Sequence, residues 1–405
     1  MSRNSAASRT SIELDVHAPG ARDSADQIWA QMREAEGLAH VPAYGGYHAV
    51  ARFEDVMKAL TTPDVFASGH GITVPPPTGI RSPHIPAEVD PPEHRHYRAL
   101  LMPFLTPQAV RQREPAVREI VRGLLDKIGD QTHFDFVEHF ARPLPVLATA
   151  SLLGLPSSDA AYLDALVVEL HDEVAKGQRT GAAQKLTGYV EKILVARKET
   201  ATDADDDLLS SIVLGTVSGR PLTLDEQVSM VRLFLVGGFD TTAIAMATLI
   251  WWLAQHPDDA QRLRDDASLM DPMIEDAVRF SSPSTYLRRQ VVKDTELGGT
   301  ALKVGDQVLI AFGAANRDPS RFENPDEIRT DRKPNPHLGF GAGNHRCVGS
   351  FFAKLEMRVA LEEIFARYSS LRLDPERPIQ TASGLNQGIS FLPIVAEYRD
   401  RAGQS

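Results

Sequence analysis

The feature that most restricts the fold of this chain is a nearly continuous apolar run from Leu233 to Ala254. The run is long enough to cross a membrane, but Gly237, Gly238 and Asp240 lie near its middle, followed by two threonines. An uncompensated carboxylate at the centre of a bilayer costs about 3 kcal/mol on insertion scales. We therefore predict that Leu224–Gln255 forms a long helix through the centre of a soluble protein. A buried helix that keeps an acid and hydroxyls in its middle is a candidate position for chemistry.

The composition limits the classes of function. The chain has 405 residues and a formal net charge of −11, from 43 Lys and Arg against 54 Asp and Glu. This acidic balance argues against a nucleic-acid-binding protein, which needs a net basic surface. Residues 1–20 are polar and lack the apolar stretch of a secretory signal. We predict a disordered tail over 1–20, one domain over 21–405, and a cytoplasmic monomer that binds neither nucleic acid nor a membrane.

Helical periodicity dominates the chain from Asp90 to about Arg279. Strand-like alternation follows in Tyr286–Glu296 and Val304–Ala311, and the turn Leu297-Gly298-Gly299 separates the two. The Pro- and Gly-rich segment 69–89 is expected to be a functional loop, and Asp90 is expected to cap the helix that begins after it. We predict a mainly α fold, a helix-rich body with small β-sheets, whose main helices cover 116–127, 143–153, 160–175, 182–200, 224–255, 257–267, 272–280 and 349–368.

Cys347 is the only cysteine, so the chain cannot form an intramolecular disulfide or a multi-cysteine metal centre. It lies in the decapeptide FGAGNHRCVG, residues 340–349, whose glycines let the backbone turn tightly and leave room for a large group. The N-terminus of the helix that follows stabilises a thiolate. From the residues alone three interpretations stay open: a buried structural thiol, a nucleophile for which His345 is a poorly placed base, and a thiolate ligand of a heme iron.

This decapeptide resembles the heme-binding signature of the cytochrome P450 family, and the resemblance extends from about Val50 to Pro393. It implies a single-domain P450 fold around a buried heme b, with Cys347 as the axial thiolate and metal ligand of the iron. By the same resemblance, His345 would hydrogen-bond a heme propionate and Phe340 would pack beside the thiolate. The other propionate contacts that the resemblance implies are His94, Arg98 and Arg289.

The central helix resembles the family's oxygen-activation motif in Gly237–Thr242. There Asp240 would pass protons inward from solvent, and the Thr241 hydroxyl would hand them on during O–O bond cleavage. The alternative is that Thr241 only bonds back to a helical carbonyl oxygen and Asp240 only forms a salt bridge.

One pattern departs from the family. The helix before the first predicted strand usually carries Glu and Arg three residues apart, whereas here Asp276 precedes Arg279. We expect Asp276, Arg279 and Arg332 to form a buried network that steadies the cysteine loop. The alternative is that Glu275 replaces Asp276 at the i, i+4 spacing.

Within the family the chain looks closest to the soluble bacterial members, particularly the camphor-hydroxylase subfamily. Such a pocket is apolar with few anchors, so we expect a small hydrophobic substrate, a cyclic terpenoid or norisoprenoid. No Tyr occurs between Phe66 and Asp90, so the phenolic donor expected for camphor itself is missing; Ser82 or His84 would be weak substitutes. The likeness implies a pocket lined by Leu233, Val236, Gly237, Thr285, Leu385 and Asn386, together with Ile72, Val74 and Ile80 of the loop.

Electrons must come from another protein, because the sequence has no flavin or nicotinamide fingerprint. The resemblance implies a 2Fe–2S ferredoxin with an NAD(P)H-dependent reductase, and Arg346, Arg111 and Arg113 are candidates for its docking patch. The expected function is hydroxylation of a hydrophobic substrate with O2. Two alternatives stay open, a heme-thiolate peroxygenase and a non-catalytic heme-binding sensor, and the pair Asp240-Thr241 argues against both.

Overall fold

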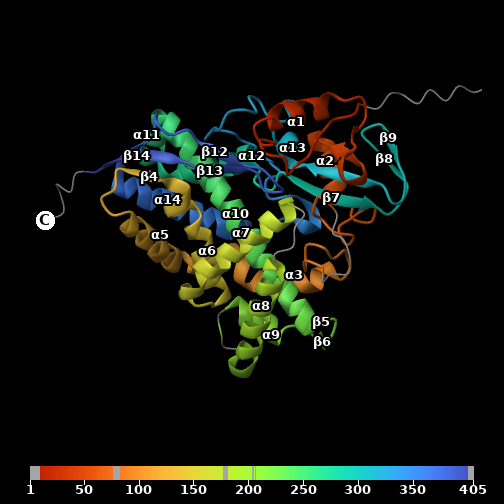
Figure 1. Ribbon diagram of the computed structural model, residues 1–405, viewed down its shortest axis with the longest axis horizontal. Coiled ribbons are helices and arrows are strands. Elements are labelled where there is room, and N and C mark those ends of the chain that lie inside the picture. The colour runs from red at the N-terminus through yellow and green to blue at the C-terminus, as the bar shows by residue number, and fades with distance from the viewer. Residues whose placement is uncertain (1–9, 76–82, 177–180, 203–204, 206, 400–405) are drawn as a thin grey trace, which may run out of the picture.

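The computed structural model describes residues 10–75, 83–176, 181–202, 205 and 207–399. Figure 1 shows a large helix-rich part, coloured from yellow through green to blue, beside a smaller part at the upper right that holds the red helices and the cyan strands. The C-terminal end lies at the opposite side of the helix-rich part. The mainly α fold with small sheets that the sequence predicts is therefore confirmed.

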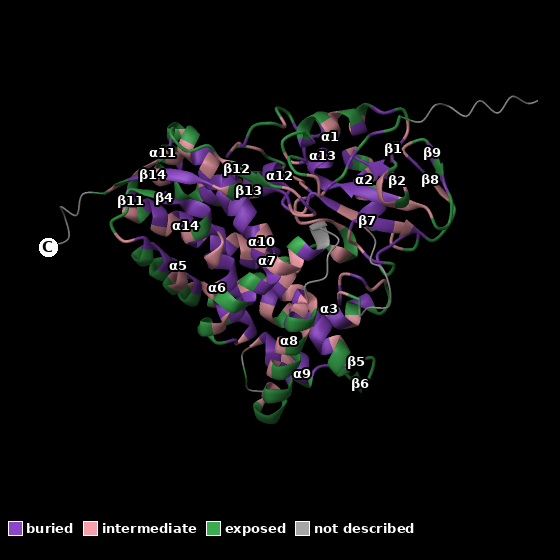
Figure 2. Cartoon of the chain, in the orientation of Figure 1, coloured by how far each residue is buried: buried purple, intermediate pink, exposed green. Residues whose placement is uncertain are grey.

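The centre of the helix-rich part is α10 (Leu224–Gln255), the predicted long helix. A capping box fixes its start: the Thr223 hydroxyl accepts from the Glu226 N–H at 3.3 Å, and the Glu226 carboxylate accepts from the Thr223 N–H at 2.8 Å. Among the described residues α10 is the one helix long and apolar enough to cross a membrane, yet 61% of its most apolar window is buried. Figure 2 shows this burial by surrounding elements, which identifies α10 as a core helix.

Most of the helices packed against α10 agree closely with the predicted ranges, but the short helix over 208–214 was not predicted. They supply the main hydrophobic cluster of the protein, which explains why the central apolar run is buried on most sides. These helices are α6 (Pro143–Leu153), α7 (Ala160–Lys176), α8 (Ala182–Thr200), α9 (Leu208–Leu214), α11 (Pro257–Asp265), α12 (Met270–Ser281) and α14 (Ser350–Arg367).

The smaller part is built on a five-stranded sheet with the order β1-β2-β10-β7-β3. β10 is parallel to β2 and antiparallel to β7, so one sheet joins strands from residues 39–67 to strands from residues 286–311. The strands are β1 (Ala39–Val41), β2 (Tyr47–Val50), β3 (Phe66–Ala67), β7 (Tyr286–Val291) and β10 (Gln307–Ala311), and the associated helices are α1 (Ala25–Glu34), α2 (Phe53–Thr61) and α13 (Phe312–Asn316).

The remaining elements are short or lie at the edges of the helix-rich part. A three-stranded sheet has the order β11-β14-β4, and three hairpins complete the strands. The helices are α3 (His94–Leu105), α4 (Pro107–Gln112) and α5 (Glu114–Ile128), and the strands of the three-stranded sheet are β4 (His133–Asp135), β11 (Tyr368–Leu373) and β14 (Pro393–Tyr398). The hairpins are β5 (Thr216–Val217) with β6 (Arg220–Pro221), β8 (Thr295–Leu297) with β9 (Thr300–Leu302), and β12 (Gln380–Ala382) with β13 (Gly388–Phe391). The single turns are η1 (Ala43–Gly45), η2 (Val137–Ala141), η3 (Ser157–Asp159), η4 (Ala267–Leu269) and η5 (Gly343–His345).

Three predicted boundaries are wrong. The strand predicted over 304–311 begins only at Gln307, where β10 starts. The strand predicted over 286–296 ends at Val291, where β7 stops. Gly298 and Gly299 have φ of +54° and +75°, the left-handed values of a two-residue hairpin turn, so they join the short strands β8 and β9 instead. The helix predicted over 257–267 ends at Asp265, because the Asp266 carboxylate accepts the Ser268 N–H at 2.9 Å and starts η4.

The predicted tail over residues 1–20 differs from the structure in its second half. Residues 1–9 lie outside the described residues, but Ile12, Leu14 and Val16 are buried in the cluster that surrounds Trp29. The Ile12 N–H donates to the His40 carbonyl oxygen at 2.8 Å. Because these three apolar side chains alternate with other residues, one face of the segment packs on the fold although its overall composition is polar.

Asp90 does not cap α3, contrary to the prediction. Its carboxylate accepts the N–H groups of Ser68 at 2.8 Å and Gly69 at 2.9 Å, and α3 begins only at His94. These bonds tie the end of the loop over 69–89 to its start. Residues 76–82 of this loop, including Ile80 and Ser82, lie outside the described residues.

A buried ion network joins α12 to the segment that leads to the cysteine loop. The Asp276 carboxylate lies 2.5 Å from the Arg279 guanidinium and 2.9 Å from that of Arg332, and Asp276 and Arg279 are fully buried. It also accepts the backbone N–H of Arg329 at 2.7 Å. One carboxylate thus holds two guanidinium groups and the backbone of the connecting segment.

Glu275 takes no part in this network. Its carboxylate contacts His337 at 2.8 Å and Lys354 at 2.6 Å. The structure therefore contains the Asp276–Arg279–Arg332 network that we expected. Asp276 binds both arginines although its side chain is shorter than that of Glu, and Glu275 does not replace it.

We predict that Asp276→Ala lowers the free energy of unfolding by about 3–5 kcal/mol, because it leaves two guanidinium groups without their anion. Since the network steadies the cysteine loop, the variant should also lose the expected heme. Denaturant unfolding and the heme content of the purified protein measure both effects. Glu275→Ala is the matched control; normal heme content in Asp276→Ala with a loss in Glu275→Ala would contradict the assignment.

Candidate active site

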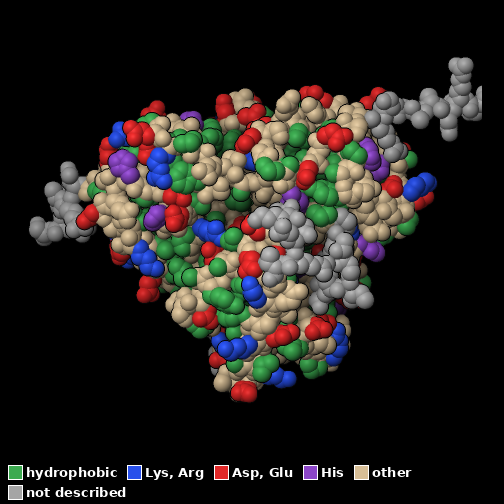
Figure 3. Space-filling model, viewed as in Figure 1, with side chains coloured by type: hydrophobic (Ala, Val, Ile, Leu, Met, Phe, Trp, Pro, Cys, Tyr) green, Lys and Arg blue, Asp and Glu red, His purple; other side chains and the backbone are tan. Residues whose placement is uncertain are grey.

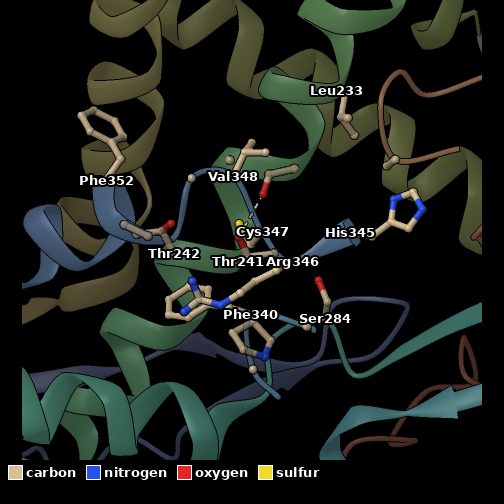
Figure 4. A pocket seen from close by; sticks show the side chains of 18 of the residues that line it. Leu233, Thr241, Thr242, Ser284, Phe340, His345, Arg346, Cys347, Val348 and Phe352 are labelled. Atoms are coloured by element: carbon tan, nitrogen blue, oxygen red, sulfur yellow. Dashed lines mark hydrogen bonds between the residues drawn. The ribbon is translucent and has the colours of Figure 1, made fainter. Parts of the chain in front are cut away.

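A cavity lies between α10 and the cysteine loop. Figure 4 shows the side chains of Leu233 and Thr241 from α10 and of Cys347 and His345 from the loop around this space. The cavity is therefore lined by parts of the two sequence segments that were singled out for chemistry.

The cysteine loop is a tight turn held by backbone bonds. The Cys347 N–H donates to the Phe340 carbonyl oxygen at 2.8 Å. Gly341 and Gly343 have φ of +66° and +64°, and a Cβ on Gly343 would lie 2.5 Å from the Leu60 carbonyl oxygen. Only glycine fits these two positions without strain, which accounts for the glycine pattern of the decapeptide.

The Cys347 side chain faces the cavity, so it has accessible surface there although protein encloses it on its other sides. This enclosure raises the pKa of the thiol, and the N–H groups of Gly349 and Ser350 and the charge of Arg98 act in the opposite direction. A thiol that faces a cavity and lies next to N–H donors is suited to bind a metal ion, which removes its proton.

A cluster of basic side chains lines the same cavity: His94 and Arg98 of α3, Arg289 of β7, and His345 of the loop. The rings of His94 and His345 lie 4.4 Å apart. Burial lowers the pKa of Arg289 to about 10, and burial together with the charge of Arg289 lowers the pKa of His345 to about 3. The lowered pKa values of Arg289 and His345 mean that a further positive charge in this cluster is unfavourable.

This basic cluster lacks an anion. Among the described residues, no carboxylate forms an ion pair with Arg289, and the Nε2 atom of His94 and both ring nitrogens of His345 have no hydrogen-bond partner. Arg98 donates to a backbone carbonyl oxygen, that of Asn344, at 3.2 Å. Buried polar groups are normally satisfied, so these side chains fit a ligand that carries acidic groups.

α10 presents small and hydroxyl-bearing residues to the cavity. A Cβ on Gly237 would meet no atom within 4 Å, so the absent side chain leaves open space. The Thr241 hydroxyl donates to the Gly237 carbonyl oxygen at 2.9 Å, the bond that the alternative interpretation expected. The hydroxyl oxygen still has lone pairs with which to accept a hydrogen bond from the cavity side.

Asp240 does not line the cavity. Its Oδ2 atom lies 2.7 Å from Nδ1 of His171 on α7, and these two side chains are 25% and 34% exposed. The acid and the alcohol are adjacent in sequence but face different surroundings. No sequence motif pointed to His171.

Part of the predicted substrate pocket lies elsewhere. Leu233 and Gly237 line the cavity, whereas Val236, Thr285, Leu385 and Asn386 are absent from its described wall. Thr285 is buried, and its hydroxyl donates to the Ser282 carbonyl oxygen at 3.1 Å. The neighbouring Ser284 lines the cavity instead.

The loop residues of the predicted pocket are also absent from the wall. Val74 packs in the N-terminal cluster, and its carbonyl oxygen accepts from His17 at 2.8 Å. Ile72 is fixed by its N–H, which donates to Glu88 at 3.0 Å. The residues that form the rest of the described apolar wall, and that the sequence did not single out, include Pro86, Ala87, Leu101, Leu152, Phe234, Ala245, Leu287 and Phe352.

Glu356 of α14 is an unexpected acid in the cavity wall. It is 2% exposed, its Oε2 atom has no hydrogen-bond partner in the described structure, and burial raises the pKa of its carboxyl group well above the ordinary value. Burial without a partner thus favours the protonated form of this carboxyl group over the charged form.

A thiol aimed into a cavity, basic side chains without an anion and an open helix face together define a heme-thiolate site. The comparisons with known proteins agree. The family model for cytochrome P450 matches residues 174–394. The putative cytochrome P450 126 of Mycobacterium tuberculosis is 33% identical over 371 residues, which cover 88% of each chain.

Two further relatives extend the likeness. The erythromycin C-12 hydroxylase of Saccharopolyspora erythraea is 31% identical over 369 residues, 87% of this chain and 90% of the relative. The solved structure of a mutant of P450 EryK in complex with erythromycin B has a TM-score of 0.86 and 29% identity, and the match covers 96% of this chain and 100% of that one.

The chain belongs to the cytochrome P450 family, whose members are heme-thiolate monooxygenases. The resemblance that the cysteine decapeptide suggested is thereby confirmed, and so is heme b as the cofactor. The residues present fit this cofactor, because the thiol of Cys347 faces the cavity and the unpartnered donors of the basic cluster match its two propionates.

We predict that Glu356→Gln leaves the protein at least as stable as the wild type at pH 7. A raised pKa in the folded state means that the folded state holds a proton that the unfolded state releases above about pH 4.5, so this residue destabilises the wild type increasingly as pH rises. Thermal unfolding of both holoproteins at several pH values measures the difference. An advantage of the Gln variant that shrinks as pH rises would contradict a raised pKa of Glu356 in the folded state.

Proposed function

We propose that this P450 hydroxylates a small hydrophobic substrate, a cyclic terpenoid or norisoprenoid, with O2 and electrons from a 2Fe–2S ferredoxin and its NAD(P)H-dependent reductase. We further propose that it works as one heme-thiolate domain over residues 21–405, as a cytoplasmic monomer. The observation that carries the proposal is the chemistry of the cavity wall, which combines a heme-thiolate site with an apolar remainder.

Each group of the site has a separate task in this proposal. When bound, the heme supplies the activation of O2 and the oxidation of the C–H bond. Cys347 holds the iron and donates electron density to it, and the basic cluster binds the propionates. The Thr241 hydroxyl holds a proton-transfer position beside the open space at Gly237, and Asp240 moves protons from the exposed side of α10 toward it.

The cavity favours an uncharged substrate. The ionisable side chains in its described wall are those that serve the heme, Arg346, and Glu356, whose carboxyl pKa burial raises well above the ordinary value. The hydroxyls of Thr242 and Ser284 are the polar groups best suited to orient a substrate. An apolar cavity with few polar groups binds compact hydrophobic molecules by burying their surface.

Two relatives bear the name of erythromycin, which is a larger and more polar molecule. A macrolide is therefore the second candidate substrate class. The alternatives of a peroxygenase and of a heme sensor remain distinct proposals about the reaction, and the Asp240-Thr241 pair disfavours both because neither needs a proton route.

We predict that a panel of cyclic terpenoids and norisoprenoids shifts the heme spin state of the holoenzyme, and that erythromycin does not. The shifted compound should then be converted to a product with one oxygen atom from labelled O2 when ferredoxin, reductase and NADH are supplied. Spectral titration and mass spectrometry of the product make the measurements.

The outcomes separate the candidates. Binding of erythromycin in place of every terpenoid would contradict the substrate class. Equal product formation with hydrogen peroxide and no ferredoxin would support the peroxygenase, and binding without any product would support the sensor.

A ferredoxin needs a basic site near the heme. Arg346, directly beside Cys347, and Arg111 of α4 are exposed, and Arg113 is half-buried and has a bonding partner. Basic and acidic side chains are otherwise interspersed on the face that Figure 3 shows. A local basic patch is thus compatible with the net acidic charge, and it would steer an acidic partner.

We predict that Arg346→Glu raises the apparent KM for ferredoxin about tenfold at low ionic strength, because it replaces attraction by repulsion. Steady-state NADH oxidation at varied ferredoxin concentration measures the change. Lys198→Glu, a charge reversal at an exposed position of α8, is the matched control. An equal effect in both variants, or none in Arg346→Glu, would place the docking patch elsewhere.

A further inference from the structure

His171 of α7 is, among the described residues, the ionisable side chain in contact with the carboxylate of Asp240. Their Nδ1 and Oδ2 atoms lie 2.7 Å apart. Both side chains are partly exposed, so water reaches the contact. The pair lies on the side of α10 away from the cavity wall, one residue from Thr241, which does line the cavity.

The nearest charges do not replace His171 in this position. The carboxylate of Asp164 on α7 forms an ion pair with the guanidinium of Arg142 at 3.0 Å, and this pair occupies the Arg142 guanidinium. Burial raises the pKa of Asp164, Arg142 opposes the rise, and the negative charge of Asp240 adds to it. Asp164 is thus an acidic neighbour of Asp240 and not a source of positive charge for it.

Other charged groups of α7 and of the elements packed on it also have partners of their own. Lys185 of α8 pairs with Glu169 at 3.0 Å. Asp159 of η3 accepts from the hydroxyl of Tyr189 on α8 at 2.7 Å. Glu173 of α7 accepts the backbone N–H at the start of α8 at 2.8 Å. In the part of the chain that the structure describes, His171 is the side chain placed in contact with the Asp240 carboxylate.

We propose that His171 takes protons from solvent and supplies them to Asp240, and so acts in the hydroxylation as a positioning and proton-supplying residue. The inference rests on the role of Asp240 and Thr241 in the proposed function. An imidazole nitrogen can both accept a proton and donate it, which suits a group that takes up protons and passes them on. Lys or Arg at this position would hold the carboxylate but would not release a proton.

The step balances without a further reactant. One proton leaves Nδ1 of the imidazolium for Oδ2 of Asp240, which becomes a neutral acid and donates toward Thr241. The neutral imidazole is partly exposed, so its ring can turn to take a proton from water at Nδ1 and return to the carboxylate as a cation. O–O cleavage with formation of water consumes two protons, and two such cycles supply them.

Two substitutions separate proton supply from simple pairing. His171→Gln keeps an N–H group for Asp240 but carries no mobile proton, and His171→Arg keeps a positive charge. The matched control is His133→Gln, an exposed histidine of β4. The holoenzymes are compared with ferredoxin, reductase and the panel compound that gives the largest spin-state shift.

The expected result is a fall of kcat of about tenfold in both His171 variants, since general acid catalysis contributes more than this and water replaces part of a remote donor. The solvent deuterium isotope effect on kcat should increase. The KM, the heme content and the reduced carbon monoxide spectrum should equal those of the wild type and of His133→Gln.

A measurement that needs no turnover tests the contact itself. The imidazole 15N signals of His171, recorded for the diamagnetic reduced carbon monoxide complex, should change in Asp240→Asn, because the charged partner of Nδ1 is removed. Unchanged signals would overturn the proposed pair.

The kinetic outcomes are equally decisive. Wild-type kcat and isotope effect in both variants, or full recovery of kcat in His171→Arg, would overturn proton supply by His171. If Asp240→Asn loses turnover while the His171 variants do not, only this inference fails. If Asp240→Asn also keeps full turnover, the proton route in the proposed function fails with it.

Discussion

The structure depends on burying α10 while leaving one strip of this helix uncovered. Most of its length is enclosed by the surrounding helices, as an apolar core helix must be. Two adjacent glycines then serve opposite purposes. A Cβ on Gly238 would lie 3.0 Å from Oγ1 of Thr149, so this glycine permits the close approach of α6, whereas Gly237 faces open space at the cavity. The packing of the core and the shape of the site are therefore set within two residues.

The opposite wall is built around charge rather than apolar packing. The basic cluster holds buried donors without partners, a costly arrangement that the propionates of the heme offset. The Asp276 network is the complementary case, since its buried carboxylate satisfies two guanidinium groups within the protein. The Asp276 network thus has its counter-charges within the protein, whereas the basic cluster would receive its counter-charges from the propionates of the cofactor. The folded cysteine segment and the bound heme therefore stabilise each other.

The sequence predicted what depends on local pattern and missed what depends on side-chain direction. The helical ranges and the cysteine loop could be predicted because periodicity and glycine positions act over a few residues. The substrate wall could not be predicted in the same way. Ser282 has a φ of +40°, and after this turn Ser284 lines the cavity while Thr285, the residue expected there from likeness, is buried. His171 contacts Asp240 only through the packing of α7 on α10, and no local motif carries that information.

The geometry of α10 separates its cavity face from its solvent-reaching face, as the proposed function requires. Gly237 and Thr241 are four residues apart and share the cavity face of α10, while Asp240 is rotated from Thr241 by about 100°. Asp240 therefore meets α7 and solvent instead of the cavity. An apolar wall excludes water and cannot conduct protons, so they must enter where the polar side of the helix reaches the surface. In the proposed function the adjacent acid and alcohol would connect the two sides without placing a charge in the substrate space.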